Sequence, residues 1–295
     1  MLPAANKSIS DEAAESMRPV GALIVGHGTR DQCGTAEFRE LVRNVADRMS
    51  PLPVEAGFLE LAEPTIAAGF QRLVDRGVRS VVVAPILLFA AGHARRDVPE
   101  ACVEAAVAAG LKADDVRQAA HLGLDERIVE LSVQRFREAA EAGDRERRET
   151  ASVGPIGLDE TFHLFVGRGT TDPAALEEFH EFARLRRSAG PCSGQGSAFA
   201  ALAEPTLATG LATARASACR RVIVQPHLLF GGSLLEQVQA ATASASRDDP
   251  TKQWLVTRQL GVDPLLVDLV AHRITTTLET RPTPAVGKQD NVPQR

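Results

Sequence analysis

Short apolar runs alternate along the chain with segments whose apolar residues recur at helical spacing. The apolar runs predict buried strands at 22–25, 54–59, 78–88 and 116–121. The helical spacing predicts helices at 35–49, 65–76, 96–109 and 125–140, and Gly77 and Gly110 follow two of them as stop signals. Strands that alternate with helices in this way predict an α/β fold, in which a parallel sheet of about four strands is flanked by helices.

The same pattern occurs twice. The segment ALIVGHGTRD at 22–31 aligns with HLFVGRGTTD at 163–172, at an offset of 141 residues. LAEPT at 61–65 recurs at 202–206, and 79–89 aligns with 220–230, both at the same offset. LGLD at 122–125 aligns with LGVD at 260–263 at an offset of 138. Repeats of this kind predict two tandem copies of one domain.

The copies set the expected domain organisation. We predict an N-terminal domain at 19–143, a charged linker at 144–159 that becomes rich in glycine and proline, and a C-terminal domain at 160–280. The polar segments 1–18 and 281–295 are predicted to be disordered tails.

Three polar side chains fall at the carboxyl ends of three predicted strands of the first copy. His27 follows the first strand, Glu60 the second, and His93 lies just past the third. Ligands of α/β proteins bind beyond the carboxyl ends of the strands. Two imidazoles and a carboxylate suit a divalent transition metal, and they also suit proton transfer near neutral pH.

The second copy serves as an internal comparison for these three residues. At the offset of 141, His27 becomes Arg168, Glu60 becomes Ala201 and His93 becomes Leu234. The apolar scaffold persists while all three polar groups change. This pattern predicts one working site in the first copy and a degenerate second copy.

The motifs around these residues are VGHGTR at 25–30, GFLELAEP at 57–64 and PILLFAAGH at 85–93. Together they resemble the sirohydrochlorin chelatases of the CbiX/SirB group, which are class II, ferrochelatase-like enzymes, in their two-copy long form. The resemblance covers roughly residues 19–280. It implies a chelatase-like fold with flavodoxin-like winding. It also implies that His27, Glu60 and His93 bind the incoming metal and act in catalysis. Some long members of the group carry a His-rich run or an iron–sulfur CxxC segment, and this chain has neither.

The implied activity is ATP-independent insertion of a divalent metal into sirohydrochlorin, for siroheme or cobalamin synthesis. The metal is a substrate, Co²⁺ or Fe²⁺ ahead of Ni²⁺, and no permanently bound cofactor is expected. No GxxxxGK[ST] loop for ATP occurs in the sequence. Sirohydrochlorin is a polycarboxylate, so we expect it to be bound by the residues that flank the motif histidines: Arg30, Arg95, Arg96, Gly28 and Gly92.

Composition and charge limit the kinds of binding partner that we expect. The net charge of −5 argues against nucleic-acid binding, and no apolar run approaches the roughly 18–20 residues of a membrane span. The four cysteines form no CxxC pair and, in a chain without a secretory signal, predict buried thiols in a reducing cytoplasm. We expect a monomer in which the two copies pair within one chain.

Two alternatives use the same residues. A metal-binding protein or metallochaperone could hold a divalent metal with these ligands and bind no tetrapyrrole. A histidine-phosphatase-like hydrolase would also place a histidine in a glycine loop, but Gly26 stands where that chemistry expects an arginine. His121 ends the fourth predicted strand and ranks below the three candidates. The other histidines are predicted to be structural or exposed: His163, His180, His227 and His272.

Overall fold

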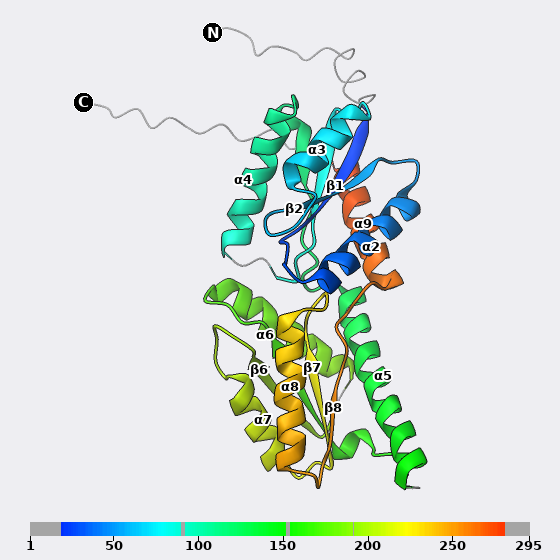
Figure 1. Ribbon diagram of the computed structural model, residues 1–295, viewed down its shortest axis with the longest axis vertical. Coiled ribbons are helices and arrows are strands. Elements are labelled where there is room, and N and C mark those ends of the chain that lie inside the picture. Colours follow the sequence, from blue (N-terminus) through cyan, green and yellow to red (C-terminus); the bar gives the residue numbers. More distant parts are fainter. Residues whose placement is uncertain (1–18, 90–91, 152–153, 191, 281–295) are drawn as a thin grey trace, which may run out of the picture.

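Two lobes stacked end to end make up the molecule (Figure 1). The computed structural model describes residues 19–89, 92–151, 154–190 and 192–280. Both predicted tails, and residues 152–153 of the predicted linker, lie outside them. None of the helices in the described residues has the length and apolarity that crossing a bilayer requires.

Each lobe is built on a four-stranded parallel sheet. The first sheet has the order β2-β1-β3-β4 and the second the order β6-β5-β7-β8. The strands are β1 (Val20–Gly26), β2 (Val54–Phe58), β3 (Ser80–Pro85), β4 (Val116–Gln118), β5 (Thr161–Gly167), β6 (Gly194–Phe199), β7 (Arg221–Pro226) and β8 (Gln253–Val256). The predicted α/β fold with two related parallel sheets is therefore confirmed. Strand β3 is shorter than predicted and ends at Pro85, where the missing N–H removes a ladder donor.

The helices follow the predicted alternation. They are α2 (Gln32–Met49), α3 (Ile66–Asp75), α4 (Gly92–Ala108), α5 (Glu126–Ala151), α6 (Pro173–Ala189), α7 (Leu207–Ala216), α8 (Ser233–Asp248) and α9 (Pro264–Glu279), with short 3₁₀ turns at Ala113–Asp115 and Leu158–Glu160. Side-chain hydrogen bonds cap the N-termini of several helices, and the capping residues of α2 and α6 match between the copies. Asp31 accepts from the Gly34 N–H at α2, and Asp172 accepts from the Ala174 N–H at α6.

Helix α5 continues well beyond its predicted end. It runs to Ala151, so the linker predicted to begin at residue 144 starts inside a helix. The segment DRERRET at 144–150 was interpreted as a linker because of its charge, but arginine and glutamate are also strong helix formers. The first part of the predicted linker is therefore helical.

The two repeats exchange their last helices. Helix α9, at the C-terminal end of the second repeat, packs on the first sheet, where Leu266, Leu269, Val270 and Ile274 share a core with Ile24 and Val82. Helix α5, from the first repeat, packs on the second sheet, where Phe136 and Ala140 cover Ile223. We call the first sheet with α2, α3, α4 and α9 the N-lobe, and the second sheet with α5, α6, α7 and α8 the C-lobe (Figure 1). Each lobe therefore contains chain from both predicted domains.

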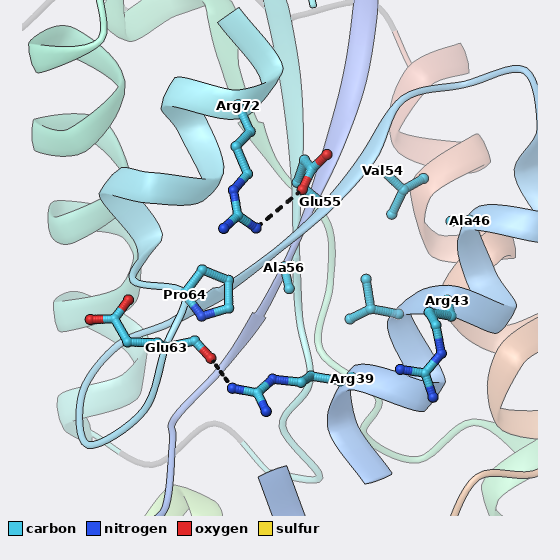
Figure 2. A pocket seen from close by; sticks show the side chains of 10 residues that line it. Arg39, Arg43, Ala46, Val54, Glu55, Ala56, Glu63, Pro64 and Arg72 are labelled. Atoms are coloured by element: carbon cyan, nitrogen blue, oxygen red, sulfur yellow. Dashed lines mark hydrogen bonds and ion pairs between the residues drawn. The ribbon is translucent and has the colours of Figure 1, made fainter. Parts of the chain in front are cut away.

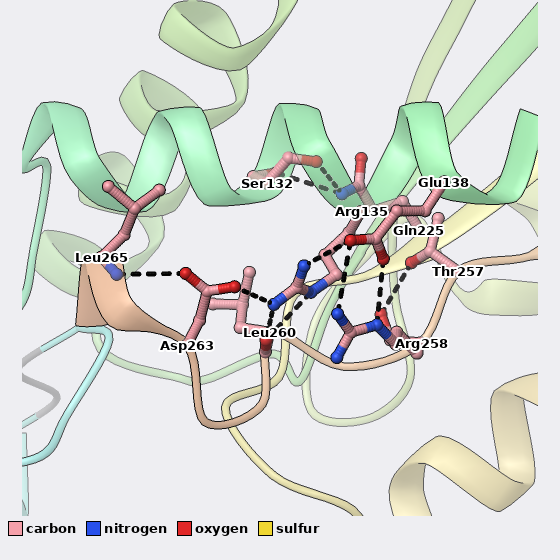
Figure 3. Close-up of polar contacts among 9 residues, drawn as sticks. All are labelled: Ser132, Arg135, Glu138, Gln225, Thr257, Arg258, Leu260, Asp263 and Leu265. Carbon is pink, nitrogen blue, oxygen red and sulfur yellow. Dashed lines mark hydrogen bonds and ion pairs between the residues drawn. The ribbon is translucent and has the colours of Figure 1, made fainter. Parts of the chain in front are cut away.

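Paired arginines hold the exchanged helices. Arg135 of α5 is buried and donates to the Leu260 carbonyl at 2.7 Å and to Asp263 at 2.8 Å (Figure 3). Arg273 of α9 occupies the corresponding position and donates to the Leu122 carbonyl and to Asp125, both at 3.4 Å. The same contact is thus made twice, once in each direction.

The carboxyl ends of the two sheets face each other, and the contacts between them are also paired. Gln259 donates to Glu37 at 2.6 Å, and His121 lies 2.7 Å from Glu178. Glu37 and Glu178 are equivalent at the offset of 141, and His121 and Gln259 at 138. Around these bonds Phe89 of the N-lobe packs edge-on against Phe179 and Phe182 of the C-lobe. The lobes are therefore joined by apolar as well as polar contacts.

Candidate metal-binding site

His27 and Glu60 come together at the carboxyl edge of the first sheet. Strands β1 and β2 are parallel neighbours in which Gly26 lies opposite Phe58, so the two loops leave the sheet side by side. The Glu60 N–H donates to the His27 carbonyl at 3.1 Å. The His27 Nε2 lies 3.2 Å from the Glu60 Oε1, and the two side chains are 48% and 52% exposed. Two of the three predicted ligands therefore meet, at an accessible position.

Gly28 makes this meeting possible. Its φ of +98° lies in the left-handed region, and a Cβ at this position would come within 1.7 Å of the Glu60 carbonyl oxygen. Only glycine allows the two loops to approach so closely. Gly28 thus has a clear structural role, while its predicted contact with substrate stays a prediction.

The C-lobe repeats this loop without the candidate ligands. The Ala201 N–H donates to the Arg168 carbonyl at 2.9 Å, and a Cβ on Gly169 would come within 1.7 Å of the Ala201 carbonyl oxygen. The backbone arrangement is therefore built equally well with arginine and alanine in place of His27 and Glu60. Folding does not require these two side chains, which favours a chemical role for them.

The third candidate lies in the segment that follows a neighbouring strand. His93 is the second residue of α4, which begins at Gly92 after β3, and β3 is the other neighbour of β1 in the sheet. The side chains of His93 and Arg95 lie outside the part of the chain that the structure describes. Among the described residues no group of three or more His, Cys, Asp or Glu stands ready to hold a metal. The geometry therefore establishes the His27–Glu60 pair, and His93 as the third ligand stays a prediction.

The structure also describes the surroundings of the other predicted residues. Arg30 and Arg96 are exposed, as substrate-binding residues would need to be. His121 pairs with Glu178 across the lobes and has a structural contact there. Of the remaining histidines, His163 and His227 are buried while His180 and His272 are exposed, as expected. Cys102 and Cys219 are buried as predicted, whereas Cys33 is exposed and Cys192 intermediate.

Two arginines on α2 were not predicted as site residues. Arg39 and Arg43 line a groove close to the site, and neither lies in a motif. Their spacing of four residues on a helix places them on one face, and the C-terminal repeat has histidine at the position of Arg39. This shared helix face, together with the difference between the repeats, was the feature of the sequence that could have pointed to Arg39 and Arg43.

The pair can do two kinds of chemistry. An imidazole nitrogen and a carboxylate oxygen are both ligands for divalent transition metals. A neutral imidazole and a carboxylate can also serve as general bases. Because both side chains are half exposed, a metal held here stays open to a second partner, which suits a metal that must be passed on.

Comparison with known proteins identifies the family of this chain. The profile of the CbiX family matches the chain twice, at residues 21–139 and 163–277. This chain belongs to the CbiX family. The two matches fall on the two repeats and leave out the segment between them. The three motifs that carry the resemblance therefore lie within the first CbiX match.

Relatives of this CbiX protein span nearly its whole length. A sirohydrochlorin ferrochelatase of Priestia megaterium is 29% identical over 259 residues, which cover 88% of this chain and 91% of the relative. A sirohydrochlorin cobaltochelatase of the same organism is 25% identical and covers 87% of this chain and 79% of its own. SirB from Bacillus subtilis, solved with Fe³⁺, superposes with a TM-score of 0.73 at 23% identity over 88% of this chain and 96% of its own. The last likeness establishes the chelatase-like fold.

Proposed function

We propose that this protein inserts a divalent metal ion into a sirohydrochlorin-type tetrapyrrole without hydrolysing ATP. The observation that carries the proposal is the His27–Glu60 pair, 3.2 Å apart on two adjoining loops that the C-lobe reproduces without either side chain. Family membership and the names of the two Priestia megaterium relatives support the same reaction. Co²⁺ and Fe²⁺ are the proposed metals, ahead of Ni²⁺.

The reaction exchanges two protons for one metal ion. Two pyrrole N–H groups lose their protons, and the ring nitrogens take up M²⁺ with their electron pairs. His27 and Glu60, with His93 as the proposed third ligand, hold the ion after it has shed part of its water shell. Glu60 and a neutral imidazole then accept the released protons and pass them to solvent. An incomplete, accessible ligand set keeps the ion from being held too tightly to leave.

The proposed substrate contacts surround this pair. Arg30, Arg95 and Arg96 follow the two motif histidines along the chain and would pair with ring carboxylates. The carboxyl end of the second sheet faces the site and is the proposed opposite wall for the macrocycle, with exposed Arg168 on it. The protein would act as a monomer in the cytoplasm.

An anaerobic insertion assay with Co²⁺, Fe²⁺ and Ni²⁺, followed by the absorbance of sirohydrochlorin, tests the proposal. His27→Ala and His93→Ala should each remove most of the activity above the spontaneous rate, and Glu60→Gln should lower it severely. His272→Ala, a change of an exposed histidine on α9, is the control and should leave the rate unchanged. Metal binding by the wild type with no change in the tetrapyrrole spectrum would instead indicate a metallochaperone.

A further inference from the structure

A groove rich in arginine runs along the free edge of β2. It has a volume of about 500 Å³ and lies between α2 and the start of α3, with β2 as its floor. Figure 2 shows Arg39 and Arg43 entering it from α2 and Arg72 entering from α3. The acidic residues of its lining are Glu55 and Glu63.

Neither acidic residue neutralises the two arginines of α2. Glu55 already faces two other cations, Arg76 at 3.0 Å and Arg72 at 3.8 Å. The Glu63 carboxylate accepts the Thr65 N–H at 3.0 Å. Within the described residues, Arg39 donates only to the Glu63 backbone carbonyl, at 2.6 Å. Arg43 forms no hydrogen bond or ion pair with any residue in the described ranges.

Two like charges one helical turn apart repel each other, so an unneutralised pair needs an explanation. The C-terminal repeat supplies the contrast. There, His180 replaces Arg39, and Arg184, the equivalent of Arg43, donates to Glu181 at 2.7 Å. The N-terminal repeat retains the corresponding acid, Glu40, yet Arg43 forms no ion pair with it. An arginine pair without a carboxylate partner in the described residues is therefore particular to the lobe that carries His27 and Glu60.

A second groove leads from Arg39 towards the loops that carry His27 and Glu60. It has a volume of about 450 Å³ and shares Arg39 and Glu63 with the first. Its lining continues to Thr29 and Arg30, just after His27, and to Leu61, just after Glu60. Arg30 also lacks an ion pair within the described part of the chain, and its equivalent is Thr171. Guanidinium groups without a carboxylate partner in the described residues thus extend from the candidate site along α2.

We propose that Arg30, Arg39 and Arg43 form a carboxylate-binding track that holds peripheral carboxylates of the tetrapyrrole while its ring lies at His27 and Glu60. The inference rests on the proposed function. Guanidinium groups bind carboxylates through two parallel N–H···O bonds, which fix orientation as well as charge. Leu61, 51% exposed in the same lining, offers an apolar surface beside the track. Arg39 and Arg43 act on binding and orientation and do not touch the reacting nitrogens.

The test uses Arg39→Gln, Arg43→Gln and the double variant of the full chain. Binding of metal-free sirohydrochlorin is measured by fluorescence, and KM and kcat are measured with Co²⁺. The double variant should raise Kd and KM roughly tenfold, the loss expected for partly exposed charged hydrogen bonds, with kcat within about twofold of wild type. Arg184→Gln, the equivalent change in the C-lobe, should alter neither constant. High salt should weaken wild-type binding more than binding by the double variant.

Further measurements separate the possible outcomes. Unchanged Kd and KM in the double variant would overturn the proposal. Thermal stabilisation of wild type by citrate, lost in the double variant while KM stays the same, would assign the groove to a free carboxylate and overturn it too. If wild type binds the tetrapyrrole but inserts no metal, the proposed function fails. The Kd comparison would still decide whether the track exists.

Discussion

At the scale of single residues, two buried histidines couple the stability of the C-lobe to pH. His227 lies among Phe89, Phe165 and Phe182, and neither of its ring nitrogens has a partner in the described residues. His163 bonds to the Gln225 side chain at 2.8 Å. Burial is the main cause that lowers the pKa of each to about 3. Both histidines are therefore neutral in the folded protein at neutral pH.

The sign of the coupling follows from these values. An unfolded histidine has a pKa of about 6.5, so below that pH the unfolded chain binds protons that the folded chain excludes. Stability should fall as the pH drops from about 6.5 towards 3, by about 1.4 kcal/mol per pH unit for each histidine. The N-terminal repeat has Ile86 at the position of His227. His227→Ile should therefore remove one proton from the pH dependence without creating a cavity.

Denaturant unfolding at pH 7.5, 6 and 5 measures this effect. The wild type should lose more stability over that range than His227→Ile, while His180→Ala, a change of an exposed histidine, should follow the wild type. Equal slopes for wild type and His227→Ile would show that His227 is protonated in the folded state or hydrated there.

The candidate residues His27 and Glu60 could be predicted because the sequence contains an internal repeat. The repeat supplies a second copy of each loop, in which Arg168 and Ala201 replace His27 and Glu60. If the fold needed the histidine and the glutamate, the second copy would have kept them. The close approach at Gly28 was not predictable, because a glycine followed by a polar turn fits many backbone conformations. Arg39 and Arg43 were missed because a charged helix face usually faces only solvent.

At the scale of elements, the paired arginines Arg135 and Arg273 make the same contacts in different environments. The Arg135 side chain is 1% exposed and its bonds to Leu260 and Asp263 are 2.7–2.9 Å long. The Arg273 side chain is 28% exposed and its bonds are 3.4 Å long. The two should therefore contribute unequally to stability, although the repeat makes them equivalent.

Arg135→Met and Arg273→Met test this difference. Removing one partner of a buried, hydrogen-bonded ion pair costs about 3 kcal/mol, whereas an exposed pair contributes about 0–1 kcal/mol. We expect Arg135→Met to lower the free energy of unfolding by roughly the larger amount and Arg273→Met by the smaller. Unfolding in urea measures both. A larger loss for Arg273→Met would contradict the assignment of these contacts.

The exchange of helices could not be predicted from the sequence. Helix α5 has the same apolar spacing whichever sheet it covers, and so has α9. Because the sheets are built from repeats, their faces are similar, and no local pattern distinguishes packing on one from packing on the other. Element type and order were set by local periodicity, while the partner of each final helix depended on how the chain passes between lobes.

At the scale of the whole molecule, the exchange makes the two lobes interdependent. The N-lobe core needs α9, whose Leu266, Leu269 and Ile274 are fully buried against it, although these residues lie at the end of the C-terminal repeat in sequence. The predicted boundary at residue 143 therefore does not separate two folding units. Neither lobe can therefore form its whole core without chain from the other repeat.

A shortened chain tests this interdependence. Residues 19–151 contain every strand of the first sheet but lack α9, so the apolar face that carries Ile24 and Val82 would be open to water. Burying an aliphatic side chain contributes about 1.5–3 kcal/mol, so losing several such side chains is comparable to the whole stability of an ordinary domain. We expect this chain to aggregate or to bind a dye for exposed apolar surface.

The matched control joins residues 19–122 through a flexible Gly/Ser linker to 263–280, which supplies α9 directly and omits α5. That chain should fold cooperatively, give dispersed amide signals and retain His27 and Glu60 on their loop. If residues 19–151 form a stable monomer with a cooperative transition, α9 is dispensable and the lobes are independent.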